Sequence, residues 1–155
     1  MREPPYSTNQ IIKACFPTTI VAGGKLPSGV DELVKLTPDG PVIMYSRALS
    51  GPEQRFAIAH ALAHVLFDDA RARMRAGYAG DPVREARADM FAVELLAPVA
   101  ELVPRIEVLP SENGDEHEIY LDSVDVIASV FGLPAAVIDA RIRDLIVTHK
   151  IVSQL

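Results

Sequence analysis

The sequence predicts a single α+β domain with a small sheet, and two observations carry this prediction. Short β-favouring runs lie between residues 18 and 47, whereas helical patterns occupy most of the chain that follows. Strands that come early and helices that come late are typical of the α+β class. The 155 residues, about half of them apolar, suffice for one domain over residues 1–155 with a hydrophobic core.

The composition narrows the classes of function. The net charge is −6 at pH 7, so broad charge-driven binding to nucleic acid is not expected, although a local basic face is not excluded. The single cysteine, Cys15, forms no internal disulfide and is expected to be a small buried residue. The first ten residues lack an apolar signal core. No apolar run approaches the roughly 20 residues of a membrane span. We therefore expect a soluble, cytoplasmic protein that does not interact with a membrane.

The N-terminal region predicts one short helix and a small sheet. Residues 7–16 carry capping residues followed by apolar residues at helical spacing, and Pro17 ends this helix. Residues 18–47 predict two or three short strands. The clearest is the run 41–47, which follows a turn at Asp39–Gly40.

A helix with two histidines is predicted next. Ser50 and Glu53 have the spacing of a capping box, and Pro52 suits the first helical turn. We expect this helix to end at about Phe67. Residues 68–81 are polar and interrupted by glycine, which predicts a loop or a frayed helix end.

A third long helix is predicted to begin at Asp81–Pro82 and to end at Pro98. The acidic segment 105–120 is predicted to be irregular, with a turn at Asn113–Gly114.

The C-terminal part, residues 121–147, has the outline of a helix-turn-helix pair. Helices are predicted at about 123–131 and 134–147, with Gly132 between them. The second helix carries two arginines that two aspartates balance, whereas a helix that reads DNA is usually more basic. We expect this pair to pack in the fold or to dock a partner, and direct nucleic-acid binding is not expected.

Two histidines on the second predicted helix have the spacing of metal ligands. His60 and His64 are four residues apart and share a helix face. A catalytic zinc site uses three protein ligands and leaves one position open for water. Glu85, which lies 21 residues beyond His64 on the next helix, is the candidate third ligand. Asp89, one turn further, is placed to accept a hydrogen bond from the outer nitrogen of a ligating histidine.

Ordinary structural roles are the alternative for each of these residues. Two histidines at helical spacing are often surface or core residues. Glu85 also suits the first turn of a helix, where the dipole favours an acid. Asp89 has Arg84 and Arg87 nearby in sequence as surface ion-pair partners.

Two segments resemble signatures of a known family. "RFAIAHALAH", residues 55–64, resembles the Arg-Phe-x-x-Ala-His-Glu-x-Gly-His segment of the ImmA/IrrE-type metallopeptidases. "EARADMFAVELLAP", residues 85–98, resembles that family's Glu-x-x-Ala-(Asn/Asp)-x-Phe-Ala-x-x-Leu-Leu-x-Pro signature. Residues 126–142 are similar to the family's C-terminal stretch, so the resemblance extends over about residues 10–147.

The resemblance implies a small zincin-like domain, with a zincin core over residues 10–104 and a cytoplasmic zinc peptidase activity. By position, His60, His64 and Glu85 match the Zn²⁺ ligands of the family, and Asp89 matches more loosely the residue that orients a ligand. The resemblance also implies a protein substrate such as a helix-turn-helix transcriptional repressor.

This chain departs from the family signature at two positions. Ala63 replaces a glycine, which is a mild change that favours the helix. Ala61 replaces the glutamate that takes the proton from the zinc-bound water. A methyl group cannot accept that proton, so we expect this chain to be nearly inactive while it still binds zinc. The glutamate at this position was either replaced by design or lost naturally, and Ala61 is consistent with both.

Three weaker candidates lie outside the two signatures. Tyr78 is either a surface tyrosine or a phenol that overhangs the cleft and stabilises an oxyanion. His117 is either a surface residue or a substrate contact. The basic run 71–75 is either a solvated face or a contact for an acidic partner.

The sequence therefore supports one main hypothesis and two rivals. The main hypothesis is a zinc-dependent endopeptidase domain of the ImmA/IrrE type that lacks its catalytic base. The first rival is a non-catalytic module, with or without zinc, that binds or sequesters a regulatory protein. The second rival, a DNA-binding regulator, would use the two C-terminal helices. No feature of the sequence determines the oligomeric state.

Overall fold

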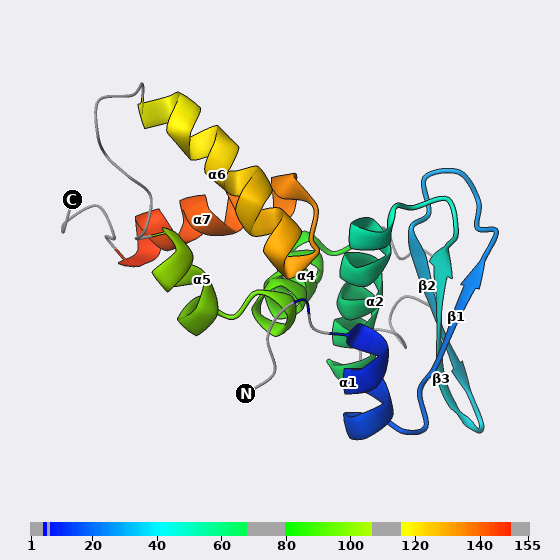
Figure 1. Ribbon diagram of the computed structural model, residues 1–155. Helices are drawn as coiled ribbons and strands as arrows, with labels where there is room; N and C mark the ends of the chain where they lie inside the picture. The colour runs from blue at the N-terminus through cyan, green and yellow to red at the C-terminus, as the bar shows by residue number, and fades with distance from the viewer. Residues whose placement is uncertain (1–4, 6, 68–79, 107–115, 150–155) are drawn as a thin grey trace.

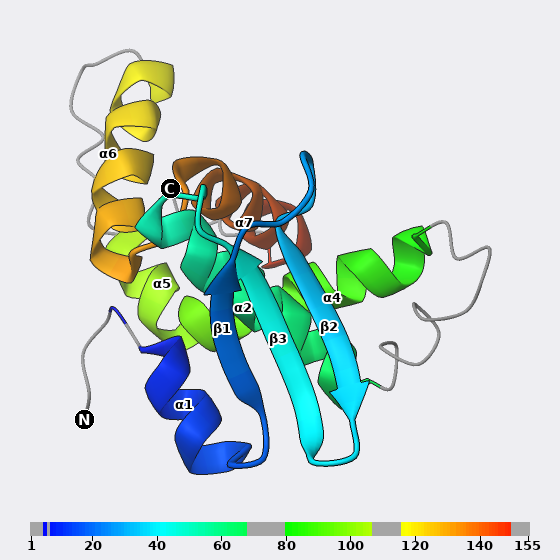
Figure 2. The same cartoon turned by 90° about the vertical axis from the view of Figure 1, so that its right-hand side faces the viewer.

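The molecule is built around a three-stranded sheet with the helices on one side of it (Figures 1 and 2). The computed structural model describes residues 5, 7–67, 80–106 and 116–149. The strands are β1 (Ile20–Gly24), β2 (Glu32–Thr37) and β3 (Gly40–Ser46). β3 lies in the middle of the sheet, parallel to β1 and antiparallel to β2. The predicted α+β class with a small N-terminal sheet is confirmed.

The turn between β2 and β3 depends on Gly40. This residue has φ +131° and pairs with Thr37 at the end of the hairpin. A Cβ atom at position 40 would lie 2.4 Å from the carbonyl oxygen of Thr18. Only glycine fits both the backbone conformation and this close approach.

Six helices belong to the described part of the chain. Their bounds are α1 (Thr8–Cys15), α2 (Gly51–Leu66), α4 (Pro82–Leu96), α5 (Val99–Ile106), α6 (Glu116–Phe131) and α7 (Ala135–His149). α1 and α2 lie next to the sheet, and α5, α6 and α7 lie on the far side of α2 (Figure 1). α2 contacts the sheet on one side and α4 on the other.

The predicted capping box of α2 is present. The backbone N–H of Glu53 donates to Ser50 Oγ at 3.4 Å, and the backbone N–H of Ser50 donates to Glu53 Oε2 at 2.7 Å. These bonds satisfy amide groups that have no partner inside the helix. The start of the helix that carries both histidines is therefore specified by its local sequence.

The second half of α2 is buried on all sides, from Ala57 to His64. One apolar cluster, which includes Ile58, Ala61 and Leu62, joins the helix to the sheet. A second cluster, which includes Ala59, joins it to the C-terminal helices. A helix that is apolar on every face lies inside a core, and the alanines allow neighbouring elements to approach it closely.

The prediction that residues 105–120 are irregular was wrong at both of its ends. α5 extends to Ile106, and α6 begins at Glu116 rather than at about residue 123. Pro98 ends α4, but its carbonyl oxygen also accepts the N–H groups of Glu101 and Leu102 at 2.9 Å and so starts α5. A proline at a helix start is compatible with both roles. The predicted turn at 113–114 lies outside the described residues.

Cys15 is exposed, which contradicts the expected burial. The inner side of α1 is formed by Thr8 and Ile12. Phe16, the next residue, packs against the cluster between the sheet and α2. The chain thus turns its phenyl ring and not the thiol toward the core.

The two C-terminal helices form a bent pair. α6 and α7 are bent by 108° at the break between them, and Gly132 in that break has φ +60°. This angle matches a helix-turn-helix arrangement. Within the described residues no single helix has the length and apolar character to cross a membrane, and this bent pair meets that test only when its two helices are combined.

Candidate metal centre

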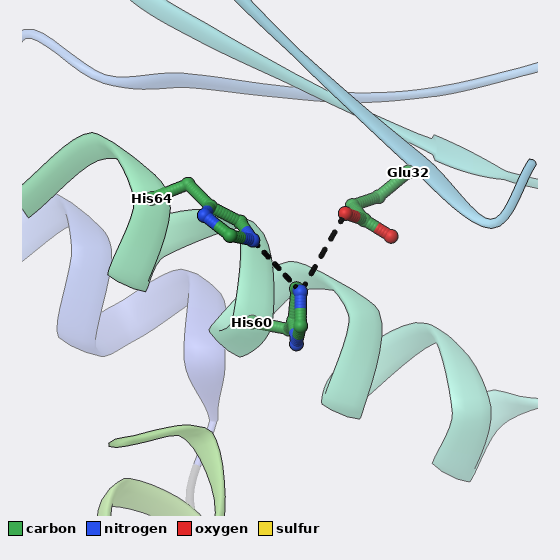
Figure 3. A group of neighbouring side chains, drawn as sticks. All are labelled: Glu32, His60 and His64. Carbon is green, nitrogen blue, oxygen red and sulfur yellow. Dashed lines mark hydrogen bonds and ion pairs between the residues drawn. The ribbon is translucent and has the colours of Figure 1, made fainter. Parts of the chain in front are cut away.

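Three elements bring titratable side chains to one place. α2 supplies His60 and His64, α4 supplies Glu85 and Asp89, and the first residue of β2 supplies Glu32. Figure 3 shows the two imidazole rings and the Glu32 carboxylate turned toward one another. α2 and α4 pack against each other, and Ala59 of α2 and Ala88 and Ala92 of α4 are fully buried.

The nitrogen and oxygen atoms of the predicted ligands converge. His64 Nε2 lies 2.9 Å from His60 Nε2. Glu85 Oε2 lies 3.1 Å from His60 Nε2 and 3.4 Å from His64 Nε2. Three donors at about 2.0–2.1 Å from a tetrahedral zinc ion lie about 3.3 Å apart. The three side chains thus fit a Zn²⁺ ion by donor type and by spacing.

Asp89 lies on the other side of the same imidazole ring. Its Oδ1 is 2.8 Å from His60 Nδ1. A carboxylate there accepts a hydrogen bond from Nδ1–H, which leaves the lone pair of Nε2 directed at Glu85 and His64. Of its expected ion-pair partners, Arg84 pairs with Asp81 at 3.3 Å, and the Arg87 guanidinium lies 4.3 Å from the centre of the Phe67 ring.

Both histidines are buried: His64 is fully enclosed, and His60 is 9% exposed. The surface role considered for them therefore does not describe this structure. When the neutral form of His60 donates from Nδ1 to Asp89, its Nε2 lone pair faces the Glu85 carboxylate. Two acceptors at this distance require a cation between them, which is either a proton or a metal ion.

The pKa of His60 reflects this environment. Burial lowers it, but the hydrogen bond to Asp89, the negative charges of Glu32 and Asp89 and the hydrogen bond to Glu85 raise it, and the net shift is upward from 6.5. The site therefore attracts positive charge.

Glu32 is the member of this group that sequence reasoning missed. Its Oε1 lies 4.0 Å from His60 Nε2. One atom of each of Glu32, His60 and His64 lies within 4.8 Å of the others. Helical spacing does not reveal a residue on a strand. The useful signal was alternation along β2, because Glu32 and the buried Val34 point to the same face of the sheet.

Position 61, where the zinc peptidases have their glutamate, lies on the sheet side of α2. Ala61 is fully buried in the apolar cluster that also contains Val34 and Ile43. Tyr78 lies outside the described residues, and the side chain of His117 is not described.

A mostly apolar cavity of about 340 Å³ lies beside the site, between α4 and α7. It is lined by Phe56, Asp89, Met90, Val93, Ala136, Val137, Ala140, Arg141 and Asp144. Asp89 borders both the cavity and the Nδ1 atom of His60. The cavity is therefore on the side of the ring away from the converging donors, and it is not the place where a metal would bind.

The sequence profile of the IrrE N-terminal-like domain, a peptidase family, matches residues 24–143. The match includes β2, the histidine helix α2 and the glutamate helix α4. The chain belongs to this family. The resemblance of the two signatures to the ImmA/IrrE type is confirmed.

One solved structure shows the same fold as this IrrE-like domain. It is a Mycobacterium tuberculosis transcriptional regulator, with a TM-score of 0.59 and 22% sequence identity. The alignment covers 85% of this chain and 38% of the regulator. The IrrE-like chain therefore spans less than half of the length of that protein. The search of curated protein sequences found no match to the IrrE-like chain.

Proposed function

We propose that this IrrE-like domain binds Zn²⁺ through His60, His64 and Glu85 and recognises a protein without hydrolysing it efficiently. The observation that carries the proposal is the convergence of the three donors, with separations of 2.9, 3.1 and 3.4 Å. Membership of a peptidase family supports zinc as the metal and a polypeptide as the ligand.

The side chains of the site have separate roles in this proposal. His60 and His64 supply neutral imidazoles, Glu85 supplies a carboxylate, and Asp89 orients His60 through Nδ1. A zinc ion with an open coordination position would polarise a carbonyl group and activate a water molecule. Ala61 cannot accept the proton of that water, and loss of such a base lowers a rate by about 10²–10⁴.

The partner that we propose is a regulatory protein such as a helix-turn-helix repressor, in the cytoplasm. The structural similarity to a protein described as a transcriptional regulator supports a regulatory setting. The net charge of −6 favours a protein partner over direct binding to nucleic acid.

Zinc content tests the metal part of the proposal. We expect about one zinc per chain in protein purified without added metal, and none in the His64→Ala variant. His149→Ala, which alters a histidine outside the two family signatures, is the matched control and is expected to retain the metal. A parent protein that takes up no zinc even when zinc is supplied overturns the proposal.

A second candidate is a wholly non-catalytic binding module. The burial of Ala61 among apolar side chains favours it, because this core accommodates a methyl group where a peptidase has a carboxylate. The module predicts that Ala61→Glu leaves partner binding unchanged and that neither form cleaves the partner. Cleavage by the Ala61→Glu protein supports a peptidase that lacks only its base.

A further inference from the structure

Glu32 points from the sheet into the metal centre. Side chains alternate along β2, so that Leu33 is 46% exposed whereas Val34 is 8% exposed and packs in the cluster with Ala61. Glu32 is on the Val34 side, and its side chain is only 13% exposed. The strand therefore directs a carboxylate at α2 on the side where the family glutamate is missing.

The carboxylate approaches the face of His60 on which the other donors converge. Its Oε1 lies 4.0 Å from Nε2 and not beside Nδ1, which Asp89 occupies. Figure 3 shows Glu32 opposite the two imidazoles. Four donors around one tetrahedral ion are about 3.3 Å apart, so a small rotation of a flexible glutamate suffices to complete the set.

The charges favour four ligands over three. Two neutral imidazoles and the carboxylates of Glu32 and Glu85 carry a total charge of −2, which a divalent cation neutralises. Without Glu32 in the set, the ion and its three ligands would carry one positive charge, and the Asp89 carboxylate beside His60 offsets it only in part, because that side chain is 55% exposed and screened by water. A site that is mostly shielded from water favours the neutral set, because buried net charge is costly.

We propose that Glu32 is a fourth protein ligand that closes the metal site. This inference rests on the metal site of the proposed function. A zinc ion with four protein ligands has no open position for water and is structural, whereas a catalytic site keeps one position open. The metal would then join β2, α2 and α4, and the chain would lack both the base and the open position that hydrolysis needs.

The experiment compares Glu32→Gln with the parent and with Asp39→Asn, which removes an exposed carboxylate at the other end of the same hairpin. We expect the zinc Kd to rise at least about tenfold in Glu32→Gln and to stay unchanged in Asp39→Asn. Glu32→Asp retains the negative charge but shortens the reach, so the same loss there identifies direct coordination. Circular dichroism verifies that each variant is folded.

Cobalt in place of zinc reports the number of protein ligands. We expect the visible spectrum of the cobalt-loaded parent to be insensitive to acetohydroxamate, because no position is open. The spectrum of Glu32→Ala should change when the same probe is added. The closed site further predicts that Ala61→Glu cleaves a partner faster when it is combined with Glu32→Ala than by itself.

The outcomes separate the two proposals. A parent that binds no metal overturns the proposed function. A parent that binds metal with the same affinity as Glu32→Gln, and whose cobalt spectrum responds to acetohydroxamate, overturns the closed site and leaves the proposed function standing.

Discussion

At the scale of single residues, His60 connects most of the charged groups in the site. Its Nδ1 contacts Asp89 at 2.8 Å, and its Nε2 lies 3.1 Å from Glu85 and 4.0 Å from Glu32. Asp89 on α4 thus sets the orientation of the His60 ring, and this ring also carries one of the donor atoms that would hold a metal. Changes at Asp89 and changes of pH are the two ways to test this coupling.

Asp89→Ala is expected to raise the zinc Kd about 10–100-fold, because an unsupported His60 loses its fixed tautomer and orientation. Isothermal titration calorimetry or a competing chelator measures this Kd. Asp125→Ala, an exposed aspartate on α6, is the control. Equal affinity in the two variants would show that Asp89 does not orient the ligand.

The stability of the metal-free protein is expected to fall as pH rises. The pKa of His60 in the fold lies above its ordinary value of 6.5, so its protonated form stabilises the folded state. This contribution is complete below the unfolded pKa and is lost as pH rises through the folded pKa. Urea unfolding between about pH 6 and pH 9, with a chelator present, measures it.

His60→Asn should remove this pH dependence. Zinc should reverse its direction, because protons and the metal compete for the same imidazoles. If the parent and His60→Asn show the same pH profile without metal, His60 is not the group that titrates.

At the scale of elements, local bonds at the start of α4 place Glu85 and Asp89 on one face of the helix. Val83 N–H donates to Asp81 Oδ1 at 3.0 Å, and Pro82 occupies the first turn. Glu85 lies in that first turn, where the helix dipole favours an acid, and Asp89 follows one turn later on the same face. The N-cap therefore determines where α4 starts, and with it the positions of the two carboxylates.

Asp81→Ala is expected to lower the free energy of unfolding by about 1 kcal/mol, because it removes an N-cap. Asp81→Asn keeps a capping oxygen but loses the charge opposite Arg84, and should cost much less. Chemical denaturation measures both. Equal losses would assign the effect to the ion pair with Arg84 and not to the cap.

At the scale of the whole molecule, the candidate metal centre lies between the sheet and the C-terminal helices. One apolar cluster joins the sheet to α2, and another joins α2 to the C-terminal helices. The donors come from α2, α4 and β2, so a bound ion would link the sheet side to the helical side. Metal binding should therefore stabilise the complete domain.

Removal of zinc is expected to lower the unfolding temperature. At a free zinc concentration of 100 times Kd, binding contributes about 2.7 kcal/mol, which corresponds to roughly 5–10 °C for a domain of this size. Differential scanning calorimetry with and without a chelator measures the shift. His64→Ala should show no response to the chelator, and a parent that is equally unresponsive would contradict a metal that links the sheet side to the helical side.

The sequence by itself determined the elements and part of the site. Ser50 with Glu53, Asp81 with Pro82, and Gly132 mark helix boundaries through local bonds and backbone preferences, which depend on few neighbours. The four-residue spacing of His60 and His64 placed both on one face for the same reason. Helical spacing also indicated Glu85 and Asp89 on the next helix, and the signatures of the family matched both.

Only the tertiary structure decided which side chains from distant segments meet. Glu32 enters the site because β2 pairs with β3 and turns one face toward α2. Alternation along β2 indicates which residues share that face, but only the assembled fold shows that the histidines of α2 lie opposite it. Long-range packing sets such contacts, and they depend on the positions of several elements at once.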